Sequence, residues 1–243
     1  MKFLEKLTQK AQNNKDFEGV TVAFLGDSVT QGCFEIYKDS NNVLRSVYDK
    51  RNSYEHLFYD MMAMLYPTVP VNIVNAGIEG DTARRGAMRV ERDITRHAPD
   101  LTIVCYGLND CADTEEGIPR YVNSLASIFS QVEASGSDLI FMTPNMMNTE
   151  ISHTISDPDF LEIAKTTAKK QNSGMFDAHI EAAKALCRER NIPVCDCYSI
   201  WKSFHHAGIN TTELLSNKIN HPTREMNRIF AYELIKTIVS SAR

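Results

Sequence analysis

One serine and one histidine, far apart in the chain, carry the first chemistry that this sequence suggests. Ser28 ends the segment Gly26-Asp27-Ser28, and its hydroxyl needs a base before it can act as a nucleophile. His221 can be that base at neutral pH, and Pro222 after it favours an extended backbone at the histidine. We therefore expect Ser28 and His221 to work together in acyl transfer.

Two further segments could supply hydrogen-bond donors to the same reaction. Gly80 lets a backbone N–H approach a reacting oxygen without an intervening side chain, and Asn109 offers a side-chain amide. Together with the N–H of Ser28, they would make three donors for a tetrahedral oxyanion. Each segment alone is common in turns, whereas the complete set in this order is far more specific.

Five short apolar runs predict the strands that must position these residues. They cover residues 20–25, 69–74, 101–106, 139–142 and 192–197. Helical stretches follow at residues 54–66, 83–97, 118–133, 176–190 and 224–239. This alternation predicts an α/β fold, a flavodoxin-like three-layer α/β/α domain with a five-stranded parallel sheet in the order 2-1-3-4-5. Ligands bind at the carboxyl ends of such strands, where the candidate segments lie.

Two long segments interrupt the alternation. Residues 33–52 are polar and extended in character, and residues 145–174 include an extra helix expected near 160–169. Long insertions are often binding loops or lids, so we place both near the active-site edge of one domain that spans residues 1–243. The 33–52 insertion could shape the pocket or join two subunits of a homodimer, and the sequence leaves both options open.

The composition is that of an ordinary globular chain. Hydrophobic residues make up 43% and charged residues 23%, and the net charge is -5. The acidic balance argues against a nucleic-acid partner, and no apolar run approaches the roughly 20 residues of a membrane span. The first residues lack the features of a secretory signal, so the expected compartment is the cytoplasm.

Several polar groups are expected to be structural. The six cysteines are interpreted as buried core residues or inert thiols. Four arginines at helical spacing predict one solvated helix face: Arg85, Arg89, Arg92 and Arg96.

The four candidate segments together resemble those of the SGNH (GDSL-type) hydrolases, a family of esterases and lipases with a flavodoxin-like fold. Gly26-Asp27-Ser28 matches the nucleophile block, and residues 107–110 match the G-x-N-D block with Asn109. Residues 78–82 resemble the glycine block, which assigns the oxyanion role to Gly80. His221-Pro222 matches the last block. The resemblance spans nearly the whole chain and implies a serine esterase.

One position departs from that family pattern. The family places an aspartate three residues before the histidine, and this chain has Lys218 there. The acid normally sets the histidine tautomer and stabilises the imidazolium. We therefore predict a Ser28–His221 dyad whose Nδ1–H is held by Asn217 or by a backbone carbonyl of residues 215–219, with Lys218 turned to solvent.

The predicted function is hydrolysis of small-molecule carboxylic esters through a covalent acyl-enzyme, without metal or organic cofactor. Short acyl groups, above all acetyl, on a polar or carbohydrate alcohol are favoured. An aromatic rim suited to sugars could come from residues in or near the predicted loops: Tyr37, Tyr48, Trp201, Phe204, His205 and His206.

Other functions remain open from the sequence alone. The same nucleophile could serve an acyl-thioesterase, a lysophospholipase or an acyltransferase. A nucleotide-binding module is disfavoured because the first turn lacks both glycine-rich phosphate motifs. A metal-dependent hydrolase using His205, His206, Cys195 and Cys197 is disfavoured because their spacing fits no standard zinc site.

Overall fold

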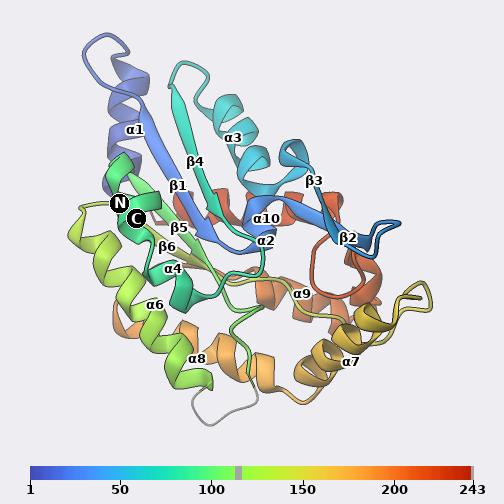
Figure 1. Ribbon diagram of the computed structural model, residues 1–243. Coiled ribbons are helices and arrows are strands. Elements are labelled where there is room, and N and C mark those ends of the chain that lie inside the picture. The colour runs from blue at the N-terminus through green and yellow to red at the C-terminus, as the bar shows by residue number, and fades with distance from the viewer. Residues whose placement is uncertain (113–116, 242–243) are drawn as a thin grey trace.

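A five-stranded parallel sheet forms the centre of the computed structural model, which describes residues 1–112 and 117–241 (Figure 1). The strand order is β4-β1-β5-β6-β7. The strands are β1 (Val20–Gly26), β4 (Val71–Gly77), β5 (Leu101–Cys105), β6 (Asp138–Met142) and β7 (Val194–Cys195). In the order of the five predicted strands this is 2-1-3-4-5, so the predicted flavodoxin-like α/β sheet is confirmed.

Helices cover both faces of the sheet. They are α1 (Lys2–Gln12), α2 (Ser28–Gln31), α3 (Tyr54–Leu65), α4 (Ala83–Ala87), α5 (Val90–Asp93), α6 (Gly117–Ala134), α7 (Pro158–Asn172), α8 (Met175–Glu189), α9 (Cys197–His206) and α10 (Arg224–Ser240). Three short 3₁₀ helices are Lys50–Asn52, Thr95–His97 and Thr211–Leu214. Within the described part of the chain, no helix combines the length and the apolar character of a membrane span.

Side chains of the inner strand β1 alternate between two apolar cores. Val22 and Phe24 of β1 join the core under α1, α3, α9 and α10, whereas Ala23 and Leu25 join the core under α4, α5 and α6. Successive residues of a strand point to opposite faces, so a continuous apolar run buries both sides of the sheet. The carboxyl ends of β4, β1 and β5 are thereby held side by side.

The predicted secondary structure needs correction in three places. The helix expected over 83–97 is broken into α4, α5 and a 3₁₀ turn, and Arg89 lies at the break. The strand expected over 192–197 is only two residues long, because Asp196 caps a new helix, α9, by accepting the N–H of Ser199. The structure also adds α1, which the sequence analysis did not predict.

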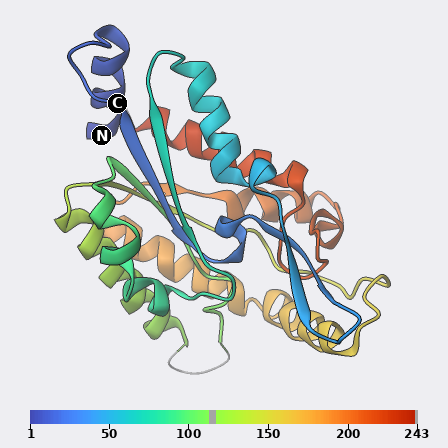
Figure 2. The ribbon, with the colours of Figure 1, turned by 45° about the horizontal axis from the view of Figure 1, so that its top comes forward.

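The two insertions meet beside the sheet. Residues 33–52 form an antiparallel hairpin of β2 (Cys33–Lys38) and β3 (Leu44–Tyr48), and the second insertion carries the expected extra helix, α7. Figure 2 shows the far end of the hairpin beside α7. Lys38 joins them through ion pairs of 3.2 Å to Asp157 and 2.5 Å to Asp159.

Candidate active site

Ser28 lies at the carboxyl end of β1, an inner strand of the sheet between β4 and β5. Asp27 caps α2 by accepting the N–H of Val29 at 3.0 Å, so Ser28 is the first residue of that helix. Gly77, at the end of neighbouring β4, makes this turn possible, since a Cβ there would lie 2.2 Å from the backbone nitrogen of Gln31. The nucleophile turn therefore packs directly against the adjacent strand.

His221 lies in a tight loop that ends in α10. An isolated bridge pairs Leu215 with Pro222, and the N–H of Ser216 donates to the His221 carbonyl at 2.7 Å. The side-chain oxygen of Asn217 accepts three backbone N–H groups inside the loop, including that of His221 at 2.9 Å. These bonds fix the loop backbone and hence the position of the histidine.

The fold brings the serine hydroxyl and the imidazole together. Ser28 Oγ lies 2.9 Å from Nε2 of His221, and each residue is only 4% exposed. A serine hydroxyl in hydrogen-bond contact with a histidine that is itself held in place is the geometry of an activated nucleophile.

The second ring nitrogen of His221 has a partner that the sequence analysis did not foresee. Nδ1 lies 3.0 Å from the backbone oxygen of Phe34, at the start of the hairpin. The expectation of Asn217 or a carbonyl of residues 215–219 is therefore wrong. Asn217 is occupied by the loop N–H groups, and Lys218 turns to Glu213, with which it forms an ion pair of 2.8 Å. With a carbonyl as acceptor, Nδ1 carries the proton and Nε2 is free to take one from Ser28.

The three predicted oxyanion donors come from the ends of three neighbouring strands. The N–H of Ser28 has no acceptor within α2 because it is the first residue of the helix. Gly80 adopts a left-handed φ of 68°, and the space a Cβ would fill is open. Asn109 donates one amide hydrogen to the carbonyl of Asp81 at 2.9 Å, which leaves its second N–H for a ligand.

An ion cluster centred on the buried Arg89 packs against these turns. No pattern in the sequence predicted it. The Arg89 cluster consists of Asp81, Arg89, Asp93 and Tyr106. Arg89 contacts Asp81 at 2.6 Å and also donates to the carbonyls of Gly26 and Ala76, at the ends of β1 and β4. Arg89 is 7% exposed, so its predicted place on a solvated helix face is wrong. The helix breaks at this residue, which lets the side chain turn inward.

Two more carboxylates lie close to this cluster. Burial raises the pKa of Asp27 to about 7, and the neighbouring charges of Asp110 and Asp81 add to the effect. Burial and the charge of Asp81 likewise raise the pKa of Asp110 to about 7. One oxygen of Asp110 accepts the N–H of Ala83 at 2.9 Å, whereas the other has no partner among the described residues. The site therefore contains carboxyl groups that titrate near neutrality.

Burial lowers the pKa of His221 below its ordinary value of 6.5. The hydrogen bond that the Phe34 carbonyl accepts from Nδ1 and the charges of Glu79 and Glu35 act in the opposite direction. Glu79, next to Gly80, is held by hydrogen bonds from Ser46 at 2.6 Å and Tyr48 at 2.7 Å. The hairpin thus fixes a negative charge beside the site, and the neutral imidazole is the main form at neutral pH.

The predicted aromatic rim is only partly present. Tyr37 and Tyr48 are half exposed on the hairpin, but Trp201 is fully buried in the core. On α9, Phe204 packs against the core as a partly buried residue, while His205 and His206 are exposed. Cys195 and Cys197 are buried with their sulfur atoms 3.8 Å apart, and all six cysteines are buried, as predicted.

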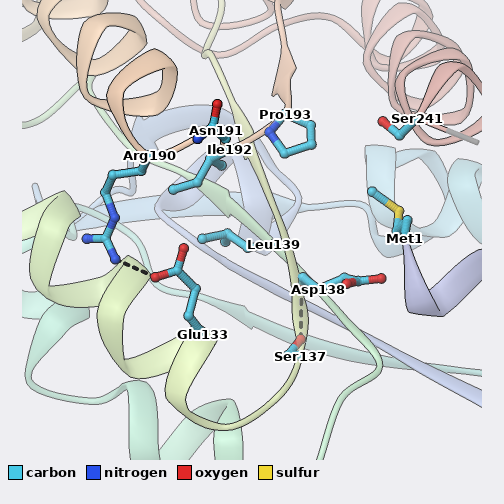
Figure 3. Close-up of a pocket in the computed structure, with 10 residues that line it drawn as sticks. All are labelled: Met1, Glu133, Ser137, Asp138, Leu139, Arg190, Asn191, Ile192, Pro193 and Ser241. Carbon is cyan, nitrogen blue, oxygen red and sulfur yellow. Dashed lines mark hydrogen bonds and ion pairs between the residues drawn. The ribbon is translucent and has the colours of Figure 1, made fainter. Parts of the chain in front are cut away.

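Several pockets lie outside the Ser28–His221 contact. A pocket of about 300 Å³ lies at the amino ends of β6 and β7, the edge of the sheet opposite Ser28 (Figure 3). Glu133 and Arg190 form an ion pair there, and no predicted site residue lines it among the described residues. A second pocket of about 480 Å³ lies between the hairpin, the start of α7 and the loop before His221, with Tyr37 and Phe160 in its wall.

Known proteins with similar sequences are esterases. An acetylxylan esterase from Geobacillus stearothermophilus is 24% identical over 135 residues, which are 52% of this chain and 60% of the relative. An arylesterase from Vibrio mimicus is 30% identical over 82 residues, 33% of this chain and 40% of the relative. Both alignments span less than two thirds of these curated relatives.

Solved structures share the fold over most of the chain. A crystal structure of an acetylxylan esterase from Geobacillus stearothermophilus matches with a TM-score of 0.66 and 21% identity, covering 91% of this chain and 94% of that chain. A two-domain esterase active on acetylated mannans matches with a TM-score of 0.67 and 19% identity. The match covers 98% of this chain and 52% of that chain. The model of the GDSL-like lipase/acylhydrolase family matches residues 24–229, and the chain therefore belongs to that family.

Proposed function

We propose that this protein is a serine carboxylic-ester hydrolase that removes short acyl groups, above all acetyl, from a carbohydrate or another polar alcohol. The observation that carries the proposal is the 2.9 Å contact between Ser28 Oγ and His221 Nε2 at the carboxyl edge of the sheet. Membership of the GDSL-like lipase/acylhydrolase family supports the same chemistry.

The first half of the reaction forms an acyl-enzyme. His221 Nε2 takes the hydroxyl proton as Ser28 Oγ bonds to the ester carbonyl carbon. The negative charge that develops on the carbonyl oxygen is stabilised by the N–H groups of Ser28 and Gly80 and by the amide of Asn109. The tetrahedral intermediate then collapses, the carbon–oxygen bond to the alcohol breaks, and His221 gives its proton to the leaving alcohol.

The second half releases the acid. Water loses a proton to His221 and attacks the acyl carbon of the ester on Ser28, and the same three donors stabilise the second oxyanion. The bond to Ser28 Oγ breaks, and the histidine returns the proton to the serine. Throughout both halves, Nδ1–H of His221 stays bonded to the Phe34 carbonyl, which keeps the ring in one orientation.

The proposed substrate class draws on the relatives and on the hairpin. The similar proteins are named for acetylxylan, for aryl esters and for acetylated mannans. The half-exposed rings of Tyr37 and Tyr48 provide aromatic surface near the site, and such surface packs well against the apolar faces of sugars.

The decisive experiment compares wild-type protein with Ser28→Ala on four substrates: an aryl acetate, an aryl ester of a longer acyl chain, an acyl thioester and acetylated xylo-oligosaccharides. We expect turnover of the acetate esters, its loss in Ser28→Ala, and a rapidly quenched wild-type sample that carries the mass of one acetyl group on Ser28. Preference for the thioester or for the longer chain would contradict the substrate class.

Asn109→Ala is the second variant in this experiment. Loss of one oxyanion donor should lower kcat by about 10²–10³. The protein should stay folded, because Asn109 is exposed and its side-chain hydrogen bond goes to the carbonyl of Asp81. Wild-type turnover in Ser28→Ala would overturn the proposed mechanism altogether.

A further inference from the structure

The carbonyl of Phe34 receives two hydrogen bonds at the back of the Ser28–His221 pair. Nδ1 of His221 lies 3.0 Å from it, and the hydroxyl of Ser216 donates to it at 2.8 Å. Phe34 belongs to the hairpin, not to the sheet that carries Ser28. The orientation of the imidazole therefore depends on how firmly an inserted hairpin is attached.

Arg224, the first residue of α10, contacts β2 of the hairpin and the residue that follows β3, near the Phe34 carbonyl. Its guanidinium lies 4.4 Å from the centroid of the Phe34 ring. It also forms a two-pronged ion pair with Glu35, at 2.6 and 3.2 Å, and donates to Asp49 at 2.8 Å. Phe34 and Glu35 are neighbours in β2, and Asp49 directly follows β3.

The same contacts involve the element that carries the histidine. Thr223 caps α10 by accepting the N–H of Met226, and its own N–H donates to the carbonyl of Leu214. Arg224 thus stands three residues after His221 on a fixed helix start. One short segment therefore carries both the imidazole and the guanidinium that contacts the Phe34 ring and the side chain of Glu35.

The charges of this arrangement also suit the reaction. Arg224 contributes one positive charge, and Glu35 and Asp49 contribute two negative charges, so the group carries a net charge of -1. The hydrogen bond to Glu35 raises the pKa of Arg224, so the guanidinium stays charged. When His221 is protonated during the reaction, the group of Arg224, Glu35 and Asp49 therefore adds no net positive charge beside it.

We propose that Arg224 is a positioning residue that holds the Phe34 carbonyl against Nδ1 of His221, in place of the acid that the chain lacks at Lys218. This inference rests on the proposed function, in which His221 is the base. A backbone carbonyl can set the tautomer and orientation only if its own position is fixed. The stacked and forked contacts of a guanidinium fix the Phe34–Glu35 segment in a way that a lysine cannot reproduce.

The test compares Arg224→Gln and Arg224→Lys with the control Arg228→Gln. Arg228 is exposed one turn further along α10. We expect both Arg224 variants to lower kcat for an aryl acetate by about 10-fold to 100-fold, the scale of a small misplacement of a catalytic group, with KM nearly unchanged. Arg228→Gln should keep the wild-type values. Addition of methylguanidinium should restore part of the lost kcat in Arg224→Ala.

A spectroscopic measurement tests the inference without relying on turnover. In protein with ¹⁵N-labelled histidine, the Nδ1–H of His221 should give a slowly exchanging signal, assigned by its absence in His221→Gln. The signal should broaden or disappear in both Arg224 variants and persist in Arg228→Gln, while far-ultraviolet circular dichroism stays unchanged. An unchanged signal and unchanged kcat in Arg224→Gln would overturn the positioning role, as would an Arg224→Lys variant with wild-type behaviour. If the signal responds as expected but Ser28→Ala remains active, the proposed function fails and the contact stands.

Discussion

Two turns at the carboxyl edge of the sheet are each held by one arginine, and the two arginines differ in their surroundings. Arg89, under the turn that carries Gly80, is 7% exposed and bonds to the ends of two sheet strands. Arg224, behind the loop that carries His221, has a side chain that is 33% exposed and bonds to the inserted hairpin. The oxyanion side is therefore built into the central sheet, whereas the histidine side depends on an insertion.

The difference in burial between the two arginines predicts different effects on stability and on activity. Arg89 cannot be removed without leaving the charge of its buried partner Asp81 unpaired in the core. A partly exposed arginine can be removed at small cost, because water replaces its contacts. We therefore expect the Arg89 cluster to govern folding and the contacts of Arg224 to govern the geometry of the histidine.

The largest effect should come from Arg89→Met. The substitution leaves Asp81 buried without its main partner, so the free energy of unfolding should fall by about 3–5 kcal/mol. Urea denaturation of this variant beside Arg224→Gln measures the contrast directly. The expected loss for Arg224→Gln is about 1 kcal/mol or less. Equal losses of unfolding free energy in the two variants would contradict the expected difference between Arg89 and Arg224.

Asp110→Asn should have an intermediate and pH-dependent effect. The pKa of Asp110 is raised from 3.8 to about 7, so between these values the native protein binds a proton that the unfolded chain has lost. Asp110 therefore lowers stability as the pH rises from about 4 to about 7. The asparagine variant should escape this loss and gain about 1–3 kcal/mol relative to wild type above pH 7.

Urea denaturation of both proteins at pH 5 and pH 8 checks this prediction. The charge of Asp110 helps to raise the pKa of Asp27, so the difference between the two proteins reports the titration of Asp110 together with its effect on Asp27. A difference in unfolding free energy that does not change with pH would show that the Asp110 carboxyl is ionised throughout.

The smallest effect is expected for Glu79→Gln, which tests the charge that the hairpin holds beside His221. His221 must be neutral to act as the base, so activity should fall as the pH drops through its pKa, which lies below 6.5. The charge of Glu79 raises this pKa, and its removal should move the acid limb of kcat/KM to lower pH by about one unit or less.

A matched control is Glu91→Gln, an exposed carboxylate on α5 at the opposite face of the sheet from α10. Its pH profile should coincide with that of wild type. A shift of the Glu79→Gln profile to higher pH, or no shift, would mean that Glu79 does not act on the imidazole.

The sheet and the edge where the candidate residues meet could be predicted from the amino-acid sequence. Continuous apolar runs indicate strands buried on both faces, and alternation with helices indicates the parallel order that the structure confirms. Ligands bind at the carboxyl ends of such strands, and this rule predicted that Ser28 and His221 lie at the same edge of the sheet. These inferences work because apolar periodicity and turn residues are properties of single segments.

The hydrogen-bond acceptor of His221 Nδ1 and the buried position of Arg89 depend on tertiary packing and could not be predicted from the sequence. A backbone carbonyl is present in every residue, so no residue type marks Phe34 as the acceptor, and only the docking of the hairpin selects it. Helical spacing places Arg89 on a solvated face only if the helix is unbroken, and the break turns that side chain into the core. Contacts between segments distant in sequence depend on how these segments pack, and that information does not reside in any one of them.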